Sequence, residues 1–396
     1  MKELNQISAQ EIGRRLRIAR ENANINQEDA AKVIGLSRPT LVSIEKGTRR
    51  VRIQELQALA TEYGTTVNAI LRREAVHTDL VPRFRRLMEN EDAYTREAVQ
   101  LLNDLVKADV ELENVLGIRT HRPYPPELGI SAGDVLELAD EHAQGLRDWL
   151  GIGISPISDI FSLIEVNLGI RLYQRRLSSK SRVSGMFAYD EAYGACILLN
   201  ANHPWERRVQ SAAHELGHFV GTRRNPEVLE ENERFLSREE RYANAFGRAF
   251  LTPKDSFSKS FENLTEGANK LTRRHVVLLA NQFSVSRQAC VLRLEELGLV
   301  RKGSWGWFDA NGGITDETVK SVLGEKASKR DLAKADADRP IPLRLSLRAF
   351  EAWNQELMSE GQLAELLKVP RIKLREVLDE IATEERFTDD VLRLGQ

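Results

Sequence analysis

The sequence predicts a mainly α protein with one small sheet, an α+β fold class, and three patterns support this prediction. Short helical patterns separated by glycine turns fill residues 1–75, and helical apolar spacing returns in the last third of the chain. Between them, three short β-type runs precede a helix with an apolar stripe. We therefore expect an all-α N-terminal domain, a domain with a small sheet, and a helical C-terminal region.

Length and composition narrow the class of protein. A chain of 396 residues exceeds one ordinary core, so two or three domains are expected. With 41% hydrophobic and 29% charged residues it is typical of a globular protein, and no apolar run approaches the ~18 residues of a membrane helix. The segment from Met1 to Gln6 lacks the apolar core of a secretory signal, so a cytoplasmic location is expected. Cys196 and Cys290 lack metal-type spacing and are expected to be buried thiols.

Short helices dominate the N-terminal region. A helix is predicted from Gln27 to Ile34, and Gly35 ends it. Ser37 is then placed to cap a third helix, which Gly47 stops. Two short helices joined by a glycine-containing turn form a helix-turn-helix arrangement. Two more helices are expected in residues 52–72, with Ile53, Leu56, Leu59 and Ala60 facing inward.

Three N-terminal segments resemble the lambda-repressor-like (XRE) DNA-binding domain: Gln27 to Ala31, Gly35 to Leu41 and Ile44 to Gly47. The resemblance implies that the third helix enters the major groove of double-stranded DNA. Candidates for contact with base edges are then Arg38, Thr40 and Ser43, and candidates for phosphate contact are Gln27 and Lys46. A helical bundle that serves protein contacts is the alternative.

Charge favours the DNA-binding interpretation. Residues 1–75 hold thirteen Lys and Arg against nine Asp and Glu, although the whole chain has a net charge of -2. Arg49, Arg50 and Arg52 directly follow the third helix. A local positive excess is a mild indication of a polyanion partner, and it adds to the DNA binding that the resemblance implies for residues 1–75.

A helical connector is expected at residues 76–135. It contains a charge-rich helical segment from Leu101 to Leu112 and then the proline-containing stretch from His121 to Pro126. Prolines at this density end a helix and mark a boundary. We therefore begin the next domain at residue 136 and extend it to residue 310.

Within this domain, β-type runs precede one apolar-striped helix. The runs are Ile170 to Tyr173, Val183 to Tyr189 and Ala195 to Leu199. Pro204 can occupy the first turn of the following helix, in which apolar residues recur at helical spacing from Val209 to Val220. One face of this helix is expected to pack against the sheet.

The same helix carries the sequence His214-Glu215-Leu216-Gly217-His218. Residues one turn apart have Cβ atoms about 5–6 Å apart, a separation that lets two imidazoles converge on one zinc ion. Glu215 is rotated by about 100° from His214, so its carboxylate can stand beside the metal and take a proton from bound water. The pattern therefore predicts a zinc site with Glu215 as the general base.

A catalytic zinc usually has a third protein ligand, and the next acidic helix is the expected source. Glu240 and Asn244 lie one turn apart there, so Glu240 could bind zinc while Asn244 orients a ligand histidine. Glu239 is the alternative ligand, but its helical phase differs by about 100° and no polar residue follows one turn later. We favour Glu240.

This region resembles the ImmA/IrrE metallopeptidase family, a zincin-like group. The matching segments are Ser184 to Phe187, Cys196 to Asn200, Ser211 to His218, Glu240 to Phe246 and Leu251 to Pro253. The resemblance covers roughly residues 136–300 and maps the third zinc ligand of the family onto Glu240. It implies one Zn²⁺ per chain and hydrolysis of a peptide bond in a specific protein, with a transcriptional repressor as the expected substrate.

The expected reaction is amide hydrolysis, in which Glu215 accepts a proton from water and passes it to the leaving amine. Tyr242, Tyr193 and His203 are unassigned candidates for an oxyanion donor. By analogy with zincins, Ala195 to Leu199 is the expected edge strand on which substrate pairs. A zinc domain that binds or senses a partner without proteolysis, in a regulator or an antitoxin, is the alternative function.

Residues 271–300 show a second helix-turn-helix-like pattern with Ser286 as a helix cap, for which a packing role is favoured over a nucleic-acid-sensing one. Residues 311–396 are expected to form a charged connector, from Lys326 to Asp338, and a helical region from Leu345 to Leu394. This C-terminal region could serve regulation or oligomerisation. Lambda-repressor-like domains often work as dimers, so the resemblance also implies a homodimer, and single-stranded DNA is a further candidate partner as an activator.

Overall fold

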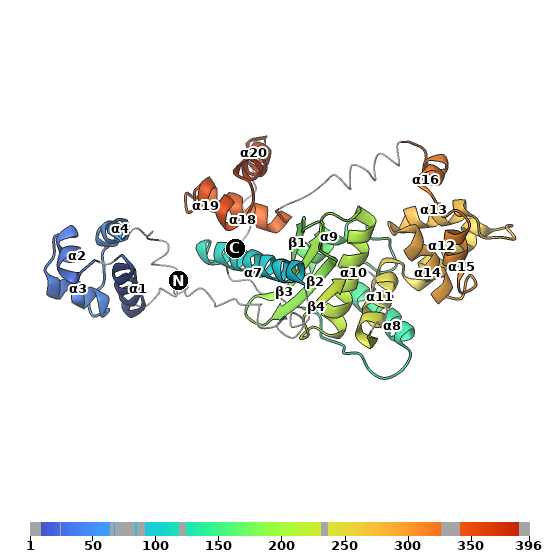
Figure 1. The fold of residues 1–396 in the computed structure, drawn as a ribbon, viewed down its shortest axis with the longest axis horizontal. Coiled ribbons are helices and arrows are strands. Elements are labelled where there is room, and N and C mark those ends of the chain that lie inside the picture. The colour runs from blue at the N-terminus through green and yellow to red at the C-terminus, as the bar shows by residue number, and fades with distance from the viewer. Residues whose placement is uncertain are drawn as a thin grey trace. The chain divides into compact units, whose positions relative to one another are not determined.

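The computed structural model describes residues 9–23, 25–63, 67, 84, 92–118, 124–230, 237–325 and 341–387 (Figure 1). The chain divides into two compact units: residues 1–77, 110–119 and 351–359 form the first, and the remaining residues form the second. The fold is mainly helical with one small mixed sheet, as the sequence predicts. Among the described residues, no helix is long and apolar enough to cross a membrane.

Four helices of the N-terminal region share one apolar core. They are α1 (Ala9–Asn22), α2 (Gln27–Val33), α3 (Arg38–Glu45) and α4 (Ile53–Glu62). Residues from all four helices fill this core, among them Leu16, Ala30, Leu41, Ile44 and Leu59. α2 begins where the Asn26 side chain accepts hydrogen bonds from the backbone N–H groups of Glu28 and Asp29. A side-chain cap on α2 and the common core thus hold the two helices of the expected helix-turn-helix.

Two details of this region differ from the sequence expectations. Ser37 stands at the N-cap position of α3, but its hydroxyl contacts the Thr40 hydroxyl at 2.9 Å and makes no bond to the helix backbone. Ile53 is 75% exposed, because it is the first residue of α4 and lies before the turn that packs on the core. The second of the two helices expected in residues 52–72 lies outside the described residues, apart from position 67.

The second unit contains a four-stranded sheet in the order β1-β3-β2-β4. Its strands are β1 (Arg171–Arg175), β2 (Val183–Asp190), β3 (Gly194–Asn200) and β4 (Glu227–Glu230). β1 runs parallel to β3, whereas β2 is antiparallel to both β3 and β4. The prediction that residues 195–199 form the edge strand was wrong: β3 is central, and every one of its residues is buried.

Two long helices carry the histidine motif and the acidic pair. α10 (Trp205–Gly221) packs on β2 and β3, and α11 (Arg238–Leu251) packs on α10. α8 (Val135–Trp149) packs against α11 in turn, so the sheet, α10 and α11 form successive layers (Figure 1). A short helix α9 (Ile160–Ser162) and a π-helical turn η1 (Leu163–Asn167) lead into β1. α10 therefore has one face on the sheet and another on α11, which explains why nearly all of it is buried.

The helices that follow α11 extend the same core. They are α12 (Lys254–Thr265), α13 (Arg273–Phe283), α14 (Arg287–Glu296), α15 (Ser304–Ala310) and α16 (Asp316–Leu323). The Ser286 hydroxyl accepts a hydrogen bond from Ala289 N at 3.1 Å, as expected for the cap of α14. Phe283, Cys290 and Leu294 are buried in the core that also contains residues of α10 and α11. This burial agrees with a packing role for α13 and α14.

A buried cluster of ion pairs joins the first of the three C-terminal helices to β1. The helices are α18 (Leu343–Asn354), α19 (Glu360–Leu366) and α20 (Arg371–Phe387), and α7 (Ala93–Val115) contributes Asp109. Asp109 contacts Arg348 at 2.6 Å and Arg171 of β1 at 3.5 Å. Burial alone would raise the pKa of Asp109, but the two guanidinium groups outweigh it and lower the pKa. Residues expected to form the charged connector, from Lys326 to Asp338, lie outside the described residues.

Candidate metal centre and DNA-binding surface

The motif residues of α10 are among the most deeply buried polar groups of the described chain. Relative exposure is 1% for His214, 0% for Glu215 and 1% for His218. Burial of polar side chains is costly unless they are paired or bind a ligand. Such burial therefore points to a built site in place of a solvated helix face.

Three ligand atoms from α10 and α11 converge. His214 Nε2 lies 3.0 Å from His218 Nε2, and the Glu240 carboxylate oxygens lie 3.3 and 3.1 Å from the two nitrogens. All three atoms fall within 4.8 Å of one another, and Glu239 is not in this group. Tetrahedral zinc with bonds of about 2.0–2.1 Å holds its ligand atoms roughly 3.3 Å apart. The spacing therefore suits one zinc-sized ion.

The electrostatics of the cluster favour metal ligation. Burial raises the pKa of Glu240, but hydrogen bonds from His214 and His218 outweigh burial and lower the pKa well below its usual range. Burial also lowers the pKa of His218, against the opposing effect of Glu240. An ionised carboxylate beside a neutral imidazole is the donor state that a divalent metal requires.

Polar neighbours fix both imidazoles. Asn244 Oδ1 lies 3.3 Å from His214 Nδ1, and the Asn244 amide group donates to the Glu240 backbone carbonyl at 2.9 Å. This second bond sets the orientation of the amide, so the carbonyl oxygen faces His214 Nδ1. A contact of Asn244 with a ligand histidine is expected from the helical phase of Asn244 relative to Glu240, and that histidine is His214.

Thr222 is a functional candidate that sequence reasoning missed. Its hydroxyl lies 3.2 Å from His218 Nδ1, at the end of α10. The signal was present, because Thr222 follows His218 by one helical turn just as Asn244 follows Glu240. Each histidine thus has Nε2 in the cluster and Nδ1 on a hydrogen-bonding side chain, an arrangement that fixes the tautomer of a ligand histidine.

Glycines allow the close approach of the elements that build the site. A Cβ atom on Gly217 would lie 2.7 Å from Ala243 Cα, and one on Gly247 would lie 3.0 Å from His214 N. These positions bring α10 and α11 close enough for Glu240 to reach the histidines. On the sheet side, a Cβ atom on Gly185 of β2 would lie 2.5 Å from Glu215 Oε1. The β2 backbone therefore passes directly against the carboxylate of the expected base.

The three candidates for an oxyanion donor occupy different environments. The Tyr242 hydroxyl contacts His142 Nδ1 at 2.7 Å in the interface between α8 and α11, which indicates a packing role. Tyr193 is only 3% exposed, and His203 Nε2 lies 3.5 Å from Asn200 Nδ2 beyond the end of β3. None of the three is part of the His214, His218 and Glu240 cluster.

Of the five candidate DNA contacts, two are exposed and three are half-buried. Arg38 and Lys46 are exposed at the two ends of α3. Thr40 and Ser43 are half-buried, and the Ser43 hydroxyl donates to the Pro39 carbonyl at 3.0 Å. Gln27 donates to the buried Glu45 carboxylate at 2.9 Å, so in this structure its amide braces α2 against α3.

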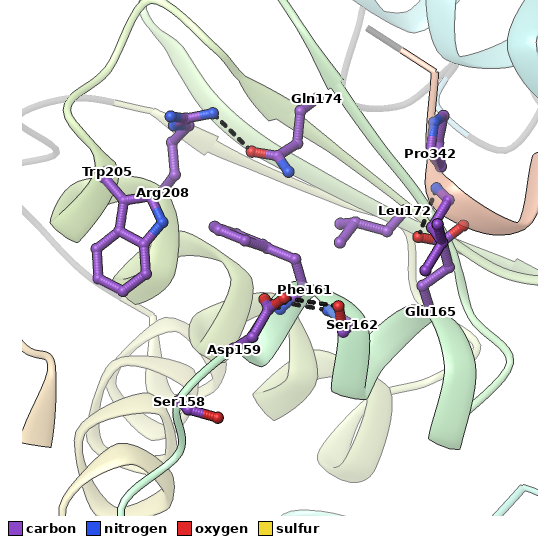
Figure 2. Close-up of a pocket in the computed structure, with 11 residues that line it drawn as sticks. Ser158, Asp159, Phe161, Ser162, Glu165, Leu172, Gln174, Trp205, Arg208 and Pro342 are labelled. Atoms are coloured by element: carbon purple, nitrogen blue, oxygen red, sulfur yellow. Dashed lines mark hydrogen bonds between the residues drawn. The ribbon is translucent and has the colours of Figure 1, made fainter. Parts of the chain in front are cut away.

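A cavity of about 180 Å³ also lies in the second unit, between α9, η1, β1, α10 and the start of α18. Figure 2 shows Arg208 bonded to Gln174 above the ring of Phe161, with Trp205 beside them. None of the residues that line this cavity is a member of the metal-type cluster. This cavity and the candidate catalytic centre are therefore separate features of the second unit.

Comparison with known proteins agrees with both modules. Residues 16–70 match a helix-turn-helix family model, HTH_3, and residues 167–295 match Peptidase_M78, described as the IrrE N-terminal-like domain. No curated protein matches the chain. One solved structure, that of ComR from Streptococcus suis, is 14% identical and covers 97% of each chain, but its TM-score of 0.16 supports no structural conclusion. The chain thus joins an XRE-type helix-turn-helix domain to an IrrE N-terminal-like domain of a metallopeptidase family.

Proposed function

We propose that this protein is a DNA-binding transcriptional regulator whose second unit hydrolyses a peptide bond in a specific protein partner, a transcriptional repressor. The observation that carries the proposal is the convergence of His214, His218 and Glu240 around one point, with Glu215 on the same buried helix. Two imidazoles and one carboxylate are a donor set typical of catalytic zinc sites, which keep one position open.

The cluster fits zinc better than the harder divalent ions. Mg²⁺ and Ca²⁺ prefer sites built from oxygen ligands, whereas imidazole nitrogen suits zinc. When bound, zinc would lower the pKa of a water ligand and polarise the scissile carbonyl group. His214, His218 and Glu240 would hold the ion, and Asn244 and Thr222 would orient the imidazoles through their Nδ1 atoms.

Glu215 is the proposed general base. Its carboxylate is fully buried and faces Gly185 of β2, where any side chain would collide with it. In the proposed reaction the carboxylate accepts a proton from the attacking water and delivers it to the leaving amine. Because the carboxylate is buried, bulk water has little access to it.

The N-terminal module explains why proteolysis would serve gene control. Exposed Arg38 and Lys46 flank a helix of the type that enters the major groove, so we propose that residues 1–75 bind double-stranded DNA. A regulator that binds DNA and also cleaves a repressor could remove that repressor at the promoter to which the regulator is bound.

The test is cleavage of a co-encoded helix-turn-helix repressor by the purified protein, with fragments identified by mass spectrometry. Reactions would be run with and without single-stranded DNA, and the matched control is Glu215→Gln. Loss of a positioned general base should lower the rate by about 10²- to 10⁴-fold while the zinc content stays unchanged. Equal cleavage by both proteins would reject Glu215 as the base, and a zinc-loaded wild type that binds the repressor without cutting it would favour partner sensing.

A further inference from the structure

β2 is the strand that borders the proposed base. Gly185 lies against the Glu215 carboxylate, and β2 contacts α10. An extended peptide whose scissile bond reaches Glu215 would therefore run beside β2. Pairing with an exposed sheet edge is one of the recurring ways in which a protein binds an extended peptide.

Both hydrogen-bonding edges of β2 are already taken. β3 pairs with one edge, and β4 pairs with the other from Val183 to Phe187. Leu229 of β4 stands opposite Gly185, so the pairing covers the position next to Glu215. A peptide that pairs outside β4 would lie one strand spacing, about 4.7–4.9 Å, farther from Glu215 than one that pairs with β2.

β4 is held less tightly than the other partner of β2. It has four residues, and its register shifts between Val183 and Gly185. Its central residues Val228 and Leu229 are half-buried, whereas all of β3 is buried. A short edge strand with an irregular register contributes few ladder bonds and little buried surface, so it is the cheapest strand of this sheet to detach.

The chain on both sides of β4 is anchored. Arg223 stacks 4.1 Å from the centre of the Phe219 ring and donates to the Pro125 carbonyl at 2.7 Å. Arg238, at the start of α11, donates to the Ser131 and Gly133 carbonyls at 2.7 and 2.9 Å. β4 can therefore leave β2 without disturbing α10 or α11, which carry the metal ligands.

We propose that β4 is an intramolecular occupant of the β2 edge, and that an extended substrate segment must replace β4 on that edge to reach Glu215. This inference rests on the proposed peptidase function and adds its regulation. A partner that draws β4 away would activate the site, and free peptides would be poor substrates until it did.

The test locks β4 in place with a disulfide. Met186 and Val228 are directly opposite, and they lie on the face of β2 away from Glu215, because Gly185 faces it. Opposite residues of antiparallel strands have Cα separations of about 4.5–5.5 Å, within the range of a disulfide. The zinc-loaded Met186→Cys, Val228→Cys protein would be compared in its oxidised form and after reduction by a phosphine.

Two zinc-binding probes distinguish strand access from metal binding: a blocked tetrapeptide hydroxamate, which needs room for an extended chain, and acetohydroxamate, which does not. We expect oxidation to weaken binding of the peptide hydroxamate by at least about tenfold, or about 1.4 kcal/mol, and to leave acetohydroxamate unchanged. A Val228→Pro, Leu229→Pro protein, in which β4 cannot pair normally, should instead bind the peptide hydroxamate more tightly than wild type.

The outcomes separate this inference from the function on which it rests. If acetohydroxamate binds and the peptide hydroxamate binds both redox forms equally, β4 does not block the substrate edge and the inference is wrong. Weaker or unchanged binding by the proline variant that still binds acetohydroxamate would also overturn it. If neither compound binds any form, the proposed zinc site itself fails, and this inference fails with it.

Discussion

The helix pair α10 and α11 and the helix pair α2 and α3 place their candidate functional residues in opposite environments. His214 and His218 are each 1% exposed, whereas Arg38 and Lys46 lie on the surface. A metal centre depends on ligand separations that must hold to a few tenths of an ångström, so its residues are buried and hydrogen-bonded. A DNA-reading helix must present its side chains to a partner, so its residues stay exposed and free to adjust.

Both pairs nevertheless contain a buried network of hydrogen-bonded side chains. The network of the first unit holds helices together, whereas that of the second unit forms the proposed metal site. In the first unit, Glu45 accepts hydrogen bonds from Arg20 and Gln27 and fixes the angle between short helices. In the second unit, the network itself is the proposed site. A substitution at the cluster in the second unit should therefore lower the rate of peptide hydrolysis or the affinity for zinc. A substitution on α3 in the first unit should lower the affinity for DNA.

Apart from a change of Glu215 itself, the largest loss of activity is expected from a change at Gly185, where β2 contacts the Glu215 carboxylate. In Gly185→Ala, the added Cβ would lie 2.5 Å from Glu215 Oε1 and must displace the carboxylate. A displacement near 1 Å can cost about 10²-fold in kcat, while zinc content should not change. Gly145→Ala on α8, where nothing lies within 4 Å of the added Cβ, is the control and should keep its activity. Unchanged kcat in Gly185→Ala would mean that the Glu215 position is not critical.

A smaller effect, a loss of zinc affinity, is expected from changes at the two polar residues that contact the imidazoles. Thr222→Val and Asn244→Ala should each weaken zinc binding by about 10- to 100-fold, measured by competition with a chromogenic chelator. Thr265→Val removes a similar hydroxyl, which bonds the Phe261 carbonyl at 2.8 Å in α12, and serves as the control. Equal zinc affinity in Thr222→Val and Thr265→Val would remove Thr222 from the site.

The smallest effect, a loss of DNA affinity, is expected from a change at an exposed residue of α3. Arg38→Ala should weaken duplex binding by about 1 kcal/mol, because one exposed contact is lost while the fold is kept. Lys32→Ala is the control, since Lys32 is exposed on α2 and pairs with Asp29 at 3.0 Å. Affinity and salt dependence equal to wild type in Arg38→Ala would contradict the assignment of α3 as the recognition helix.

Much of the fold was predictable because local patterns determine it. Three strands, the apolar stripe of α10 and the short helices of the first unit all follow from periodicity and glycine stops. The relative phase of Glu240 and Asn244 also anticipated the faces that they present to the histidines. These features depend on residues close in sequence, so one chain is enough to infer them.

The sheet order was not predictable in the same way. β4 has only four residues, and its strand conformation depends on pairing with β2 instead of on its own propensity. The central position of β3 had a signal that was overlooked: Ala195 to Leu199 is a continuous apolar run, which is typical of a strand buried on both faces. The contact between Gly185 and Glu215 joins β2 to α10 and required the assembled fold.

The most direct test of the metal centre is the zinc stoichiometry of the purified protein, measured by mass spectrometry under native conditions. We expect close to one zinc ion per chain in the wild type, and its loss in Glu240→Ala, whereas Glu239→Ala should keep the metal because Glu239 is not in the cluster. Zinc retained by Glu240→Ala and lost from Glu239→Ala, or a wild type that takes up no zinc, would contradict this account.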